Sequence, residues 1–431
     1  MPDTIVHGTL VNGAAREIRA TADGRLKVEA AFSESTASTD SFGRLRVSDA
    51  FTLFDSSHRF SDNGLWATAT ANGGAATFNA NQGLVDLSVT TASGSEVLRE
   101  TKKVFAYQPG KSLLTLDSFV FAPAKTNLRQ RFGYFGSENG IYIQQDDAQI
   151  SFVLRSKVSG SVVNTPVAQS SWNGEDRLDG SGPSGETLDL SKSQIFWLDL
   201  EWLGVGTVRC GFVIDGRFVH CHSFHHANII SATYITTACL PLRYEITNTG
   251  VTASASTLKQ ICSTVLSEGG YELRGKRFSI GTAVDAAYSM ATAGTYYPLV
   301  ALRLKASSLD AIVVPTQGSI TAQGNGLVYR WQVLSDVTVT AGTWLSVVAD
   351  SSVEYNITGT GVAGGAVVAS GYLTSSNQSS PIADIVKEAL FALQLERNSF
   401  TSTPSVIAIT LSCDTNTTTA FGSIDWEEVT R

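Results

Sequence analysis

The sequence predicts an all-β protein, with an extended N-terminal arm followed by two β-sandwich domains of the jelly-roll or concanavalin-like type. Three observations lead to this prediction. Only 16% of the 431 residues are charged, against about 25% in an average soluble protein, and Ser, Thr, Gly, Ala and Val take their place. Short apolar runs alternate with a period of two, and turn residues separate them. The length exceeds what one small domain needs.

The first 55 residues are expected to form the arm, because they repeat a strand motif without a local core. Asp23-Gly-Arg-Leu-Lys-Val28 recurs as Phe42-Gly-Arg-Leu-Arg-Val47, and in each copy Leu and Val face one side of a short strand. The residues that define the two strands are Arg25, Leu26, Val28, Arg44, Leu45 and Val47. Two such strands cannot bury a core alone, so we expect them to join a sheet of another subunit or a neighbouring protein. A floppy terminus is the alternative.

Residues 56–270 are expected to form the first sandwich, and its clearest part is a meander of three antiparallel strands. The strands lie at 194–202, 207–214 and 217–224. A Gly-containing turn joins the first two, and Asp215-Gly216 joins the last two. Asp-Gly between alternating apolar runs predicts a tight hairpin, because a type I′ turn needs positive φ at both central residues.

The strand pattern then restarts, and residues 271–431 are expected to form a second β-rich domain. Its candidate strands lie at 299–304, 327–333, 343–348, 406–411 and 422–426. One stretch, residues 382–395, is mixed: its first half could be helical, whereas its last residues alternate like a strand.

The composition excludes several classes of protein. The net charge is −8, so no basic surface for nucleic acid is expected. No apolar run is long enough to span a membrane, and the amino terminus lacks the basic and apolar regions of a signal peptide. Five cysteines without a C-x-x-C spacing are expected to be free thiols in the core. We therefore expect synthesis in a cytoplasm and no membrane insertion.

Four of the six histidines gather in His220-Cys-His-Ser-Phe-His-His226. On a regular strand His220 and His222 share one face and Cys221 lies on the other. Two such imidazoles could ligate a metal ion, with His225 or His226 as a third ligand. No carboxylate lies within the cluster and the spacing is not selective, so a solvent-facing or interface strand end is the favoured interpretation.

Two groups of acids are candidate sites. Asp199 and Glu201 are two residues apart, which gives the acid pair of a glycosidase, but no third acid or substrate platform accompanies them. An exposed strand face explains them equally well. Asp176, Asp179 and Asp189 surround a Gly-rich loop, but their spacing does not match a calcium loop. We therefore expect no catalytic residue, no cofactor and no bound metal, and hence no enzyme.

Several blocks of the sequence resemble virion structural proteins of tailed bacteriophages. The blocks are GRLRVSDAFTLFD (43–55), LDGSGPSGETLDLSKSQ (178–194), EWLGVG (201–206) and GFVIDG (211–216), with further similarity at 240–246 and 422–427. The resemblance implies a capsid decoration, fibre or tail/baseplate subunit, made in the cytoplasm of a host bacterium and located in the virion. It implies other virion structural proteins as partners and a homo-oligomer, with a trimer favoured. It carries over no catalytic residue.

The meander is also similar in shape to the back sheet of concanavalin-like and laminin-G-like sandwiches. This similarity implies an alternative function: carbohydrate-binding or carbohydrate-cleaving receptor recognition, with a host surface glycan as the ligand. A structural subunit without enzymatic activity is the first expectation, because the polar composition and the arm suit a protein that packs among neighbours.

Overall fold

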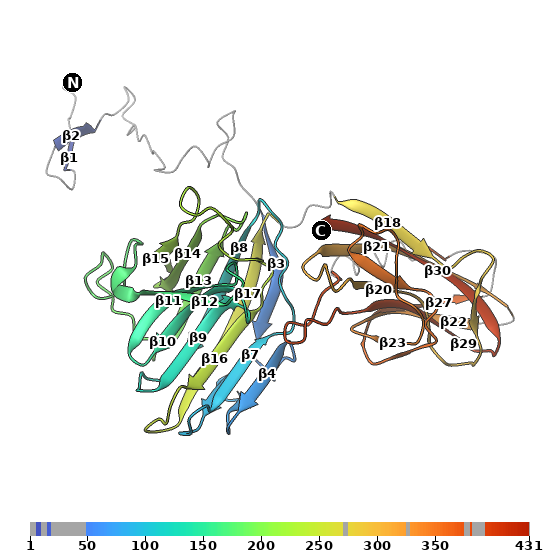
Figure 1. Cartoon of the computed structure of the whole chain (residues 1–431), viewed down its shortest axis with the longest axis horizontal. Coiled ribbons are helices and arrows are strands. Elements are labelled where there is room, and N and C mark those ends of the chain that lie inside the picture. Colours follow the sequence, from blue (N-terminus) through green and yellow to red (C-terminus); the bar gives the residue numbers. More distant parts are fainter. Residues whose placement is uncertain are drawn as a thin grey trace. The chain divides into compact units, whose positions relative to one another are not determined.

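The computed structural model describes most of the chain (Figure 1). The described residues are 6–9, 15–18, 49–269, 275–324, 328–374, 380–381 and 393–430. The chain forms two units, residues 1–49 and 50–431. In the first unit, β1 (Val6–Thr9) pairs antiparallel with β2 (Ala15–Ile18). The two predicted arm strands, including Arg25, Leu26, Val28, Arg44, Leu45 and Val47, lie outside the described residues, and so does most of the mixed stretch, residues 382–392.

The prediction of an all-β fold is confirmed. Strands account for 55% of the structure and helix for 1%. Within the described part of the chain, the helical segment is one 3-10 turn, Gln169–Ser171. No helix there is long and apolar enough to cross a membrane.

Residues 49–269 are described without a gap, and they form a sandwich of two antiparallel sheets (Figure 1). The seven-stranded sheet has the order β12 (Val163–Ala168), β11 (Gln149–Ser156), β10 (Gly140–Asp146), β9 (Leu128–Phe135), β16 (Leu242–Asn248), β7 (Glu96–Thr101) and β4 (Trp66–Ala71). The eight-stranded sheet has the order β15 (Arg217–Phe224), β14 (Val208–Ile214), β13 (Gln194–Leu200), β8 (Ser112–Val120), β17 (Ser256–Glu268), β6 (Leu84–Val89) and β5 (Ala75–Asn79), and β3 (Ala50–Ser57) also pairs with β17.

Aromatic rings fill the space between these sheets. The Phe132 ring lies 4.2 Å from Tyr244 and 5.3 Å from Phe119, measured between ring centres. Strand alternation places these rings inward, since every second residue of a strand faces the core. The predicted hairpin between β14 and β15 is present, with φ of 49° at Asp215 and 74° at Gly216. The meander therefore folds as its turn residues predict.

A second core lies in residues 276–430. In the described parts of this region, one sheet has the order β18 (Lys276–Gly281), β30 (Thr418–Thr430), β21 (Ile312–Gln323) and β28 (Ser380–Pro381), and β19 (Tyr288–Met290) also pairs with β30. The other has the order β24 (Leu345–Ser346), β25 (Val353–Asn356), β20 (Tyr297–Leu304), β29 (Ile407–Cys413), β22 (Val328–Ser335) and β27 (Ala366–Thr374). A small ribbon pairs β23 (Thr338–Thr340) with β26 (Gly361–Ala363). The core packs around Trp331, Tyr329 and Trp426.

The strand β3 follows the first unit directly. Residues 50–55, which the sequence pattern assigns to the arm, form most of this strand, and they pair with the second half of β17. Phe54 of β3 is buried in the core of the first sandwich. The first sandwich therefore begins at Ala50 with a sheet strand.

Candidate functional site

The two candidate metal ligands do not share a face, so the expectation from strand alternation is wrong. His222 lies opposite Cys210 of β14, whereas His220 lies opposite the next residue, Gly211. Cys221 is the extra residue of a β-bulge between them. Because neighbouring residues of β14 point to opposite faces, the two imidazoles opposite them do so too.

The surroundings of the two imidazoles differ accordingly. His222 packs edge-on against Phe224, with ring centres 4.5 Å apart, and stacks on Phe152. Burial lowers the pKa of His222 to about 4. His220 lies beside Trp197 and shares a hydrogen bond with Ser223, and burial lowers its pKa as well. No group of three His, Cys, Asp or Glu side chains suited to a metal ion occurs among the described residues.

The two acids of the meander occupy different environments. Asp199 forms an ion pair with Arg209 and accepts a hydrogen bond of 2.5 Å from the Ser112 hydroxyl. Glu201 is exposed and follows the end of β13. The Asp199 carboxylate is therefore neutralised by a cation on the neighbouring strand, as in an ordinary cross-strand pair.

The three loop aspartates stabilise their own loops through hydrogen bonds to the backbone. The two carboxylate oxygens of Asp176 accept hydrogen bonds from the backbone N–H groups of Leu178, at 2.7 Å, and Ser184, at 2.8 Å. Burial would raise the pKa of Asp176, but the hydrogen bonds from Ser184 and Leu178 outweigh it and the pKa is lowered. Asp179 and Asp189 each accept from the N–H group two residues ahead. These are turn contacts of the kind that Asp commonly makes.

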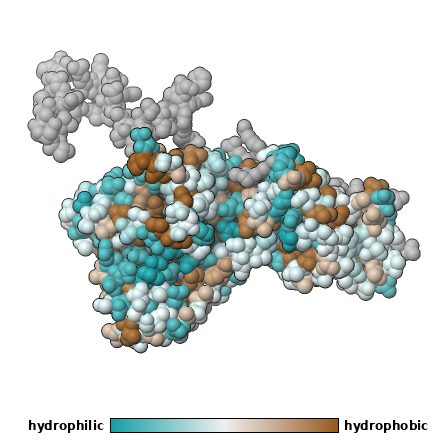
Figure 2. Space-filling view, in the orientation of Figure 1, coloured by the Kyte–Doolittle hydropathy of each residue, from teal (hydrophilic) through white to brown (hydrophobic). Residues whose placement is uncertain are grey.

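The sequence reasoning missed a charged network on the outer face of the seven-stranded sheet. Phe132 and Tyr134 of β9 face the core, so Arg129 and Arg131 of the same strand face outward. The sheet order brings Arg155 of β11 and Arg243 and Glu245 of β16 onto this face. Figure 2 shows the result as a continuous hydrophilic area over β10, β9 and β16.

Glu245 is the centre of this network. Its carboxylate oxygens accept from Arg131 at 3.1 Å, and from Arg129 and Arg243 at 3.3 Å each. Glu245 is only 4% exposed. Burial alone would raise the pKa of Glu245, but the coulombic attraction of these arginines and of Arg155 outweighs it, and the pKa is lowered. The Glu245 side chain is therefore ionised, and its carboxylate forms ion pairs with three arginines.

An aromatic layer supports the arginines. The guanidinium carbon of Arg155 lies 5.3 Å from the ring centres of both Phe135 and Tyr142. Arg131 lies over Tyr142 and Arg243 over Phe135, each also at 5.3 Å. Phe135 and Tyr142 are fully buried although they belong to the outer face. Cation–π contacts of this kind restrict the motion of the guanidinium groups.

A pocket of 450 Å³ opens beside this network. Glu100 of β7 and Arg243 of β16 are cross-strand partners and line it together, with 3.4 Å between the Arg243 Nη1 and Glu100 Oε2 atoms. The turn between β9 and β10 contributes Glu138, and the loop at 397–402 contributes Phe400. Burial raises the pKa of Glu100, and Arg243 opposes this shift only in part.

The loop at residues 398–402 is fixed against the first sandwich. The Asn398 side-chain oxygen accepts from the N–H groups of Phe400, at 2.9 Å, and Thr401, at 3.1 Å. The Ser399 hydroxyl donates to the Thr101 carbonyl at 2.6 Å, and its N–H group donates to the Lys102 carbonyl at 3.2 Å. This wall of the pocket is therefore formed before any ligand arrives.

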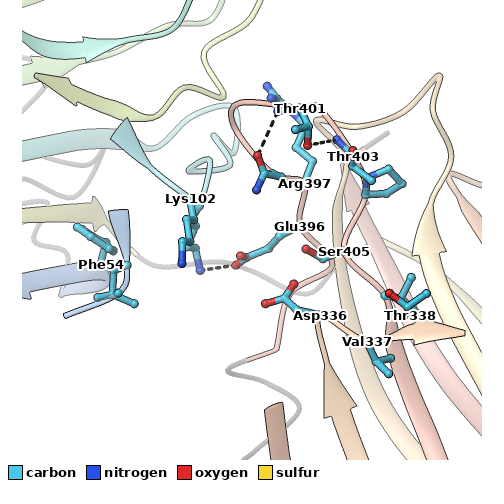
Figure 3. Close-up of a pocket in the computed structure, with 16 residues that line it drawn as sticks. Phe54, Lys102, Asp336, Val337, Thr338, Glu396, Arg397, Thr401, Thr403 and Ser405 are labelled. Atoms are coloured by element: carbon cyan, nitrogen blue, oxygen red, sulfur yellow. Dashed lines mark hydrogen bonds and ion pairs between the residues drawn. The ribbon is translucent and has the colours of Figure 1, made fainter. Parts of the chain in front are cut away.

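The same segment lines a second cavity, of 740 Å³ (Figure 3). In this view Phe54 and Lys102 lie across the cavity from Asp336. Lys103 and Glu396 form an ion pair of 2.5 Å between these walls. The Glu396 carboxylate in this cavity is therefore paired with a cation and does not stand free to act as a general base.

No family model matches the sequence, and no curated protein matches it. Solved structures similar to about half of the chain include the carbohydrate recognition domain of Emp47p, which is 11% identical over 52% of this chain and 97% of that one, with a TM-score of 0.32. A carbohydrate esterase, vb_24B_21, of the Shiga toxin-encoding bacteriophage phi24B is 14% identical over 52% of this chain and 100% of that one, with a TM-score of 0.30.

The CBM2 module of the evolved Dit of Lactobacillus casei BL23 phage J-1 is 6% identical over 53% of this chain and 100% of that one, with a TM-score of 0.34. The neighbours thus include phage-associated proteins and carbohydrate-recognition sandwiches. At these identities and TM-scores they place no functional residue on this chain, and the site rests on its own geometry.

Proposed function

We propose that this protein is a structural component of a bacteriophage particle, anchored through its N-terminal arm and presenting its β-sandwiches outward. The observation that carries the proposal is the junction at residues 49 and 50, where the N-terminal unit ends and sheet strand β3 begins. The block at residues 43–55, which resembles phage virion proteins, runs across this junction. A strand that continues into an arm is a direct way to tie a folded body to a neighbouring sheet.

Deleting residues 1–49 tests the anchoring role. We expect the truncated protein to stay folded, because β3 and the core residue Phe54 remain, and to be absent from purified particles in a complementation assay. Thermal unfolding and particle composition are the two measurements. Deleting residues 1–57 is the matched control: it removes β3 from β17 and should lower the melting temperature. Normal incorporation of the shorter deletion would contradict the proposal.

We also propose that the chain has no catalytic activity. Of the two acids that would form a glycosidase pair, Asp199 forms an ion pair with Arg209, whereas Glu201 is exposed and lies beyond the end of β13, so the two carboxylates occupy different environments. Host surface polysaccharides and peptidoglycan should therefore release no reducing sugar when the purified protein is added. The double variant Asp199→Asn with Glu201→Gln should behave like the wild type. Sugar release by the wild type that the double variant loses would make the protein a depolymerase.

A second candidate function is recognition of a host surface carbohydrate. The observation that favours it is the preformed 450 Å³ pocket, in which polar side chains and the partly exposed Phe400 ring occur together. Ligand sites commonly combine apolar surface with a few convergent polar groups. A particle subunit with such a site would bring the particle to its host.

A further inference from the structure

We propose that the pocket at Glu100, Arg243 and Phe400 binds a neutral saccharide, as one or two hexose units of a larger glycan. The inference rests on the second candidate function and names its ligand class and its residues. The volume of 450 Å³ falls within the roughly 300–1,000 Å³ of small-molecule sites. The binding of a saccharide does not depend on whether the arm anchors the protein to a particle.

The charges that line the pocket favour an uncharged ligand. Two arginines, Arg243 and Arg397, and two glutamates, Glu100 and Glu138, line the pocket, so the formal charges of these four side chains sum to zero. A charged ligand would meet both attraction and repulsion and would lose its hydration without a matching counter-charge. A ligand that carries only hydroxyl groups avoids this cost.

The same side chains offer both halves of the hydrogen bonds that a sugar needs. A hydroxyl group donates and accepts at once, and carboxylates accept whereas guanidinium groups donate. Arg243 is held in place by Glu100 and Glu245. Glu138 forms an ion pair with Lys157 and is still about half exposed, with 48% of its side chain accessible. Fixed planar groups of this kind select adjacent hydroxyls by geometry.

Phe400 supplies the apolar surface that a sugar ring also needs. Phe400 is 38% exposed, and the hydrogen bonds of Asn398 and Ser399 fix the loop that carries it. The C–H face of a hexose can cover an exposed aromatic ring, which removes apolar area from water. Because the loop is already ordered, binding costs little conformational entropy.

Saturation-transfer NMR on the full-length protein tests the proposal. The probes are glucose, galactose, mannose, N-acetylglucosamine, lactose and maltose, with glucuronate and galacturonate as the acidic counterparts. We expect transfer to at least one neutral sugar, at least tenfold stronger binding of that sugar than of its acidic counterpart, and at least a tenfold loss of affinity in Phe400→Ala. The matched control is Phe60→Ala, because Phe60 is 82% exposed and lies outside this pocket; it should bind as the wild type does.

Three outcomes would overturn the inference. They are no transfer to any neutral sugar, equal binding of neutral and acidic sugars, and unchanged affinity in Phe400→Ala. Particle incorporation of the same variant separates this inference from the structural role. A Phe400→Ala variant that enters particles normally but no longer binds sugar supports both the saccharide site and the structural role. Loss of incorporation with intact sugar binding would place Phe400 in an assembly contact and overturn the assignment of this pocket.

Discussion

Replacing Asp117 by Asn is expected to stabilise the protein at pH 8 by about 2–5 kcal/mol, since one pKa unit corresponds to about 1.4 kcal/mol. Asp117 lies on β8 and faces the space between the two sheets, where it is 1% exposed. The Ser263 and Thr115 hydroxyls lie near its carboxylate, but neither carboxylate oxygen has a hydrogen-bond partner of good geometry in the described structure. Burial raises the pKa of Asp117 to about 8, and the nearby Ser263 and Thr115 hydroxyls only reduce this shift.

The direction of the pH dependence follows from this shift. The folded-state pKa lies above the unfolded value of about 4, so the folded protein holds the proton more tightly than the unfolded chain. The stabilisation is fully present below pH 4 and is lost as the pH rises through 8. Urea unfolding at pH 5 and pH 8 measures it: the wild type should lose stability between the two, and Asp117→Asn should lose much less. Asp55→Asn, at an exposed position of β3, is the control. Equal wild-type stability at both pH values would mean that the carboxyl group is ionised in the fold.

Replacing Glu245 by Ala is expected to destabilise the protein by about 3–5 kcal/mol, the usual cost of removing one partner of a buried ion pair. Arg129, Arg131 and Arg243 would lose their shared acceptor and would repel one another in a poorly hydrated site. Because the pKa of Glu245 is lowered, its contribution is present above the unfolded pKa and is lost as the pH falls through the folded value.

Chemical unfolding at pH 7 measures this effect. Glu186→Ala, on an exposed loop, should change the unfolding free energy by less than about 0.5 kcal/mol. Glu245→Gln should fall between the two, because it keeps the shape and one acceptor oxygen but not the charge. A loss below about 1 kcal/mol in Glu245→Ala would show that solvent replaces the carboxylate, as at an exposed ion pair.

Local patterns predicted the parts of the fold that depend on neighbouring residues. The alternation of β8 and the turn at Asp215 are examples, because side-chain direction and positive φ are settled within a few residues. The bulge at Cys221 was missed, since it depends on the register against β14. Because of that single extra residue, His220 and His222 lie in two separate environments and do not share the expected strand face.

The candidate site was missed for a related reason. In the sequence, the pattern around Arg131 and Arg243 indicates only that each is an ordinary charged residue on the outward face of a half-exposed strand. Their shared acceptor, Glu245, becomes visible only when β16 is known to lie beside β9. Phe400 comes from a loop far along the chain, whose attachment to the end of β7 no periodicity reveals. The spacing of Arg129 and Arg131 at alternate positions of β9, followed directly by aromatic residues, is the one sequence signal that could have drawn attention to this face.

The pairing of β3 with β17 also determines how the body would respond to a mechanical pull. Seven residue pairs join the two strands, from Ala50 opposite Glu268 to Ser57 opposite Cys262. Tension transmitted through the preceding residues enters the body at Ala50. Where that tension runs along the strand, it acts in shear and strains the hydrogen bonds of all seven pairs together. Detachment then requires their simultaneous rupture, and Phe54 must leave the core in the same step.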